Sequence, residues 1–156
     1  MNRAAGVLFS VLVLVGLAGV ACTGDSESIY ENKGDVCIGL EGTFVDDGFS
    51  GRFVSGSVGP DAPLDVSISL GCFSSGCEGL DEAGCSAVVD GNTIRLNSFF
   101  RVALSGETAC PSDCNTFTTT CEIPPLDEGE YTLVYGNETR ALTVPADAFE
   151  CFSIPK

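Results

Sequence analysis

The chain has nine cysteines and no histidine, so cysteine is the residue type whose number and spacing limit its possible chemistry most. Without histidine, Ser-His-Asp and Cys-His catalytic groups and His-ligated zinc are excluded. Eight cysteines follow residue 22, and their spacing includes no C-x-x-C, which argues against a zinc or redox centre. An even set of eight predicts four disulfides in an oxidising compartment, formed by Cys37, Cys72, Cys77, Cys85, Cys110, Cys114, Cys121 and Cys151.

The eight cysteines form two groups of three, at 72–85 and 110–121, flanked by Cys37 and Cys151. Because three is odd, each group must send at least one cysteine to a partner outside itself. Eight cysteines allow about a hundred connectivities, and the spacing alone does not choose among them. We expect Cys37 to pair with Cys151, a bridge worth roughly 4 to 5 kcal/mol because it closes so long a loop.

The first 21 residues have the pattern of a secretion signal. A positive start at Arg3 is followed by an uncharged, mostly apolar run, 4–21, that ends in small residues. The segment 17–22, Leu-Ala-Gly-Val-Ala-Cys, resembles the lipobox of bacterial lipoproteins, with Gly19 in place of the usual Leu. The resemblance implies a diacylglyceryl group on the thiol of Cys22, with that cysteine as the new N-terminus. Ordinary signal cleavage and an uncleaved anchor are the alternatives.

The segment that follows Cys22 is polar. Residues 22–36 therefore predict a lipidated cysteine and a flexible tether, with the folded domain at 37–156. Each acyl methylene buried in a bilayer contributes about 0.8 kcal/mol, so the lipid would anchor the domain to a membrane. Resemblance to other lipoproteins favours the outer membrane, because Thr23 and not Asp follows the cysteine.

The chain is strongly acidic, with 22 Asp and Glu residues against 7 Lys and Arg residues and a formal net charge of −15. A polyanion repels phosphate backbones and anionic lipid headgroups. We therefore expect no nucleic-acid partner, and membrane contact through the lipid alone. No cofactor is predicted, and an envelope protein or a glycan is the expected partner.

Alternating apolar and polar residues predict an all-β domain. The pattern is unbroken over Leu64–Leu70, and Thr93–Leu104 repeats it with a bend expected near Asn97-Ser98. Further strands are expected at 117–123, and hairpins at 44–58, 88–94 and 131–144. Short strands at this spacing predict a two-sheet antiparallel sandwich braced by about four disulfides.

One turn of this domain carries a family resemblance. Asp127-Glu128-Gly129-Glu130-Tyr131 is similar to the D-x-G-x-Y corner of immunoglobulin-like domains. The resemblance implies that the Tyr131 hydroxyl bonds to backbone at this corner, and that Leu133 occupies the position of the second cysteine of antibody domains. The chain has no Trp and a different cysteine pattern, so the resemblance supports a sandwich more than family membership.

Acidic loops are the remaining candidates for chemistry. Asp46 and Asp47, or Glu78, Asp81 and Glu82, could offer oxygen ligands to calcium, although solvated turn residues explain them more simply. The leading hypothesis is a lipid-anchored, non-enzymatic envelope protein with a binding or structural role. The alternatives are a calcium-dependent adhesion or sensing module and a carboxylate-based hydrolase of envelope polysaccharide.

Overall fold

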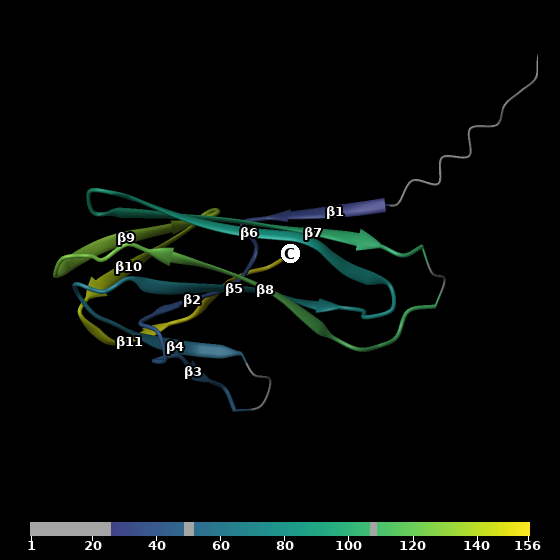
Figure 1. Cartoon of the computed structure of the whole chain (residues 1–156), viewed down its shortest axis with the longest axis horizontal. Helices are drawn as coiled ribbons and strands as arrows, with labels where there is room; N and C mark the ends of the chain where they lie inside the picture. Colours follow the sequence, from purple (N-terminus) through teal and green to yellow (C-terminus); the bar gives the residue numbers. More distant parts are fainter. Residues whose placement is uncertain (1–25, 49–51, 107–108) are drawn as a thin grey trace, which may run out of the picture.

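The computed structural model describes residues 26–48, 52–106 and 109–156, and the regular elements in these ranges are all β-strands. Two larger sheets form the sandwich (Figure 1). The first contains β1 (Ser26–Glu31), β6 (Glu78–Asp90), β7 (Thr93–Leu104), β9 (Gly129–Tyr135) and β10 (Glu138–Val144). The second has the order β12 (Phe152–Ile154), β2 (Gly34–Gly39), β5 (Leu64–Phe73) and β8 (Asn115–Ile123). The predicted all-β sandwich is confirmed.

A third, small sheet was not expected. It has the order β11 (Ala146–Glu150), β4 (Phe53–Val58) and β3 (Val45–Asp46), and in Figure 1 it lies beyond the second sheet, away from β6 and β7. Strand β4 crosses β2 so closely that a Cβ atom on Gly39 would lie 2.9 Å from the Cα atom of Gly56. Glycine at both positions therefore lets the small sheet pack against the sandwich.

The core lies between the two larger sheets and uses the apolar positions of the predicted strands. The alternating positions of Leu64–Leu70 are at most 2 % exposed on β5, and Ile94, Leu96, Phe100 and Val102 are equally buried on β7. The hairpin at 88–94, the strand at 117–123 and the hairpin at 131–144 are also present. Their burial provides the main favourable term in folding.

Strand β7 changes its neighbour where the bend was expected. Thr93–Leu96 pair with β9 in parallel, whereas Phe99–Leu104 pair with β1 in antiparallel orientation. This parallel pairing departs from the otherwise antiparallel ladders of the described strands. The short strands β9 and β1 thus lie end to end along one edge of the long strand β7.

The flexible tether predicted for 22–36 is wrong from Ser26 onward, and the folded domain begins before residue 37. Ser26–Glu31 form β1, and β2 already begins at Gly34. The polar composition misled the prediction because β1 is held by its backbone ladder and by charge, with Tyr30 as its large side chain on the core, where its ring contacts that of Phe73 with centroids 5.7 Å apart. Arg101 Nε lies 2.5 Å from Glu27 Oε1, and its guanidinium also pairs with Glu82 on β6.

The disulfides join the two cysteine groups to each other throughout. Cys72 pairs with Cys114, Cys77 with Cys110 and Cys85 with Cys121. The expected bridge between Cys37 and Cys151 is present, with Cα atoms 4.5 Å apart across 114 positions of sequence. All eight cysteines after residue 22 are therefore paired. The corner expected at Tyr131 is also present, because its hydroxyl donates to the carbonyl of Asp127 at 3.1 Å.

Candidate functional site

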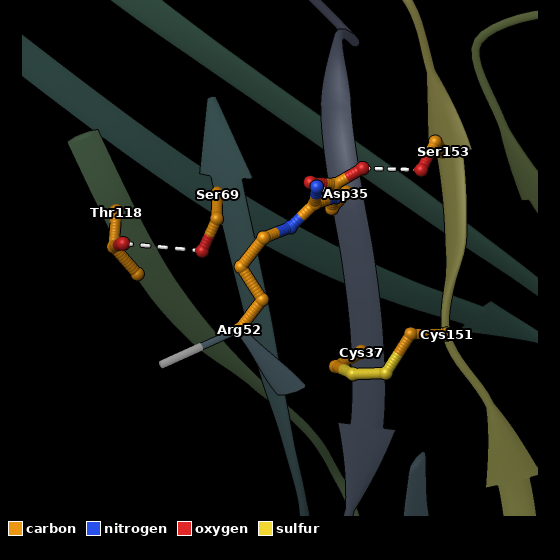
Figure 2. Close-up of polar contacts among 7 residues, drawn as sticks. All are labelled: Asp35, Cys37, Arg52, Ser69, Thr118, Cys151 and Ser153. Carbon is orange, nitrogen blue, oxygen red and sulfur yellow. Dashed lines mark hydrogen bonds and ion pairs between the residues drawn. A yellow bond between two sulfur atoms is a disulfide. The ribbon is translucent and has the colours of Figure 1, made fainter. Parts of the chain in front are cut away.

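A row of polar side chains crosses the outer face of the second sheet (Figure 2). The strand register aligns Ser153 of β12 with Asp35 of β2, Asp35 with Ser69 of β5, and Ser69 with Thr118 of β8. These residues share a face because side chains alternate along a strand, and Val36, Ile38, Ile68 and Leu70 point into the core. One side chain from each of four strands thus forms the polar row.

Asp35 is the centre of this row. Its Oδ1 accepts a hydrogen bond from the Ser153 hydroxyl, and its Oδ2 forms an ion pair with the Arg52 guanidinium, just before β4. At the end of the row opposite Ser153, the hydroxyl oxygens of Ser69 and Thr118 lie 3.1 Å apart. Both carboxylate oxygens of Asp35 are engaged, so this group is held as a fixed acceptor.

An open groove of about 740 Å³ runs beside the polar row. Lys156 lies in it: its ammonium donates to the carbonyl of Cys72 at 2.7 Å and stands 3.6 Å from the ring centroid of Phe73. The groove is lined by three members of the polar row, Asp35, Ser69 and Ser153, by polar and disulfide groups that include Arg52, Thr116, Cys72, Cys114 and Lys156, and by the apolar Leu70, Ile154 and Pro155. Hydrogen-bonding and apolar groups are therefore interspersed on this surface.

The loop 110–114, whose Cys114 lines the groove, is held by disulfides and hydrogen bonds. Two disulfides begin in it, Ser74 Oγ donates to the Pro111 carbonyl at 2.8 Å, and the Ser75 N–H donates to Asp113 at 3.0 Å. The hydrogen bonds from Ser75 lower the pKa of Asp113, because they stabilise its carboxylate form. The part of the groove at Cys114 is therefore held in place by the disulfides and hydrogen bonds of this loop.

An exposed aromatic ring lies next to Asp35 and Arg52. A small pit beside the groove shares Asp35, Arg52 and Ser69 with it and is lined in addition by Phe53. The ring of Phe53 stacks on that of Phe44, with centroids 4.8 Å apart and planes at 27°. Phe53 is nevertheless 41 % exposed. The site therefore combines a flat apolar ring with oriented donors and acceptors.

No family model, curated protein or solved structure matches this chain.

The predicted calcium candidates at 46–48 lie in a turn. Asp46 Oδ1 accepts a hydrogen bond from the Gly48 N–H at 2.8 Å, and the Asp47 N–H donates to the carbonyl of Arg52 at 2.8 Å. An aspartate that bonds to the backbone two residues ahead is a common turn feature. Within 26–48, 52–106 and 109–156, no three Cys, Asp or Glu side chains are placed to hold a metal ion.

The second acidic segment is not a loop, so that prediction is wrong. Glu78, Asp81 and Glu82 belong to the long strand β6. Asp81 lines an open groove of about 510 Å³ together with Glu27 and Glu78, so three carboxylates share one groove. Two of these carboxylates serve structure, because Glu27 pairs with Arg101 and Glu78 accepts from the Ser74 N–H at 2.7 Å.

The predicted lipidation residue, Cys22, and the signal segment 1–21 lie outside the described residues. Among the residues that are described, no helix has the length and apolar character to cross a bilayer.

Sequence reasoning missed the polar row. Its members on β5 and β8 occupy the polar positions of two predicted strands, which was the available signal. Asp35 lies in the segment 22–36 that was predicted to be a tether. Arg52 and Phe53 lie in the hairpin predicted at 44–58, and no functional role was predicted for them. Only the register across four strands brings them together.

Proposed function

We propose that this protein is a lipid-anchored, non-enzymatic recognition domain of the bacterial cell envelope, held to the membrane by acyl chains on Cys22. The observation that carries the proposal is the complete pairing of the eight cysteines after residue 22. The ninth, Cys22, has no described cysteine left as a partner, and its segment resembles a lipobox. Four disulfides in one domain also favour an oxidising compartment.

The short distance along the chain between Cys22 and β1 adds to this proposal. Strand β1 begins at Ser26, only four positions beyond the cysteine. Four residues span at most about 14 Å when fully extended. A lipid on Cys22 would therefore hold the first sheet close to the membrane surface, and the domain would act within the envelope or at its surface.

A binding role is favoured over catalysis by the way the site groups are engaged. Asp35 is paired with a guanidinium and a hydroxyl, so both of its carboxylate oxygens are held in place as hydrogen-bond acceptors. The chain also has no histidine to activate a serine or a thiol. Oriented hydrogen-bonding groups beside an exposed aromatic ring are typical of recognition surfaces.

Metabolic labelling with a palmitate analogue tests the anchor. The full chain and its Cys22→Ser variant are expressed in a Gram-negative host, with Thr23→Ser as a control that keeps the cysteine. We expect label and membrane association in the wild type and in Thr23→Ser, and loss of both in Cys22→Ser. Label that persists in Cys22→Ser, or a wild-type protein that carries none, contradicts the anchor.

Crosslinking in intact cells tests the recognition role. A photoreactive residue at Thr118 places the probe in the polar row, and one at Val88 places it on the far side of the sandwich, where the side chain is 54 % exposed. We expect a discrete envelope species crosslinked from position 118 and none from position 88. Equal products from both positions, or none from 118, contradict recognition at this face.

A further inference from the structure

We propose that the outer face of the second sheet binds a neutral glycan, with Phe53 stacked on a sugar ring and the polar row bonded to its hydroxyl groups. This inference rests on the proposed recognition role and names the class of ligand. It depends on three observations: the ring of Phe53, the donors and acceptors around Asp35, and the charge of the chain.

The ring of Phe53 offers an apolar platform. Phe44 packs on it with centroids 4.8 Å apart, so its orientation is supported, while 41 % of the Phe53 residue remains exposed. An aromatic ring left exposed costs free energy unless a partner covers it. One face of a sugar ring carries mainly C–H groups, and it fits flat against such a ring.

The polar row supplies the hydrogen bonds that orient a sugar. Sugar hydroxyls both donate and accept, and so do the hydroxyls of Ser69 and Thr118, whereas Asp35 accepts and Arg52 donates. Asp35, Ser69 and Thr118 lie on the adjacent strands β2, β5 and β8, which are spaced about 4.8 Å apart, and Arg52 reaches Asp35 from the residue before β4. The ion pair and the hydroxyl contacts fix their positions before any ligand arrives, which reduces the entropy lost on binding.

The charge of the chain favours a neutral ligand over an acidic one. A formal net charge of −15 opposes the approach of a polyanion. The two cations of the groove are already engaged: Arg52 pairs with Asp35, and Lys156 bonds to the Cys72 carbonyl above the ring of Phe73. Asp35 therefore balances the charge of Arg52, whose remaining N–H groups can still donate to a hydroxyl. Lys156 is left as the one cation of the groove lining without a carboxylate partner among the described ion pairs, against a net charge of −15.

The open form of the groove favours a chain over a single sugar. The groove of about 740 Å³ is lined from Asp35 and Ser69 to Thr116 and Lys156, and the pit that Phe53 lines adjoins it at Asp35, Arg52 and Ser69. Several consecutive sugar units could lie along it, with one of them on Phe53.

Affinity electrophoresis tests the proposal. The purified mature domain migrates as an anion through native gels, because the full chain has a sequence pI of about 4.1 and all of its Asp and Glu residues follow residue 21. The gels contain dextran, galactomannan, xylan, a soluble β-1,3-glucan or polygalacturonate. We expect retardation by at least one of the four neutral polysaccharides and none by polygalacturonate. Phe53→Ala should weaken the binding tenfold or more, and the near-isosteric Thr118→Val several-fold. Val88→Ala, on the far side of the sandwich, should bind as the wild type does.

Several outcomes would overturn the proposal: no retardation by any neutral polysaccharide, retardation by polygalacturonate alone, or equal binding by wild type and Phe53→Ala. Equal weakening in Val88→Ala would do the same. If Phe53→Ala does not fold, as judged by circular dichroism, Thr118→Val decides. The crosslinking experiment separates this inference from the recognition role. A specific product from position 118 without glycan binding rejects only the glycan, whereas loss of both rejects recognition itself.

Discussion

The hydroxyl oxygens of Ser98 and Tyr135 lie 2.7 Å apart in the interior of the sandwich, where β7 changes its partner from β9 to β1. The Tyr135 hydroxyl donates to the carbonyl of Lys33 at 2.8 Å, so Ser98 is the donor to the phenol oxygen. The Ser98 N–H in turn donates to the Asn32 side chain at 2.9 Å. This network ties the connection between β1 and β2 to the break in the β7 ladder.

Tyr135→Phe should destabilise the domain by about 2 to 3 kcal/mol. The change removes two hydrogen bonds and leaves the Lys33 carbonyl and the buried Ser98 hydroxyl without this partner. Denaturant unfolding under non-reducing conditions measures the effect. Tyr131→Phe is the matched control, because it loses only the corner bond to Asp127 and should cost about 1 kcal/mol or less. Equal losses in the two variants would contradict the role given to the buried network.

Tyr135 should ionise at a higher pH than an ordinary tyrosine in an alkaline titration. Burial raises the pKa of Tyr135 to about 12 from 10.0, although the hydrogen bond from Ser98 opposes the shift. Since the folded state holds this proton more tightly than the unfolded state, the stabilisation is complete below pH 10 and is lost as the pH rises through about 12. An ultraviolet absorbance titration of wild type minus Tyr135→Phe gives the midpoint. A difference curve centred on pH 10 would show that this phenol is not buried.

Loss of the bridge between Cys37 and Cys151 should cost more than loss of the bridge between Cys85 and Cys121. The first closes 114 positions of sequence and the second 36. The chain-entropy estimate gives roughly 4 to 5 kcal/mol for the first and about 1 kcal/mol less for the second. Double Ser variants avoid a lone thiol, and their unfolding midpoints in guanidinium can be compared directly. The reverse order would point to residual structure in the unfolded chain.

Gly84→Ala should destabilise the first sheet by about 1 to 3 kcal/mol. The added Cβ would lie 2.5 Å from Cε1 of Phe99, the residue paired with Gly84 across β6 and β7. Gly79→Ala on the same strand is the control, because no atom lies within 4 Å of its added Cβ, and it should change stability by less than about 0.5 kcal/mol. Thermal unfolding of both variants tests this. Similar melting temperatures would mean that Phe99 moves aside freely.

The individual strands with one buried side could be predicted from sequence. Apolar and polar residues alternate along Leu64–Leu70 and Thr93–Leu104, and that alternation is a local property of the chain, although Ser67 on the polar side of β5 is also buried. Strand β2 was missed because it is covered on both faces. Val36 and Ile38 meet the core, while Cys37 and Gly39 lie beneath the small sheet, so no alternation marks it.

The sequence by itself determined the all-β class and an even set of eight cysteines available for pairing, because side-chain alternation and cysteine number are properties that the chain carries locally. It favoured the bridge from Cys37 to Cys151 without excluding other pairings, and the structure contains that bridge. Only the tertiary structure decided the other three pairings and the polar row. Both depend on which strands become neighbours and in what register, and the packing of the whole core sets that choice. Asp35 and Thr118 lie in line on one face because Ser69 of β5 is paired with both of them, a relation that no short segment of sequence encodes.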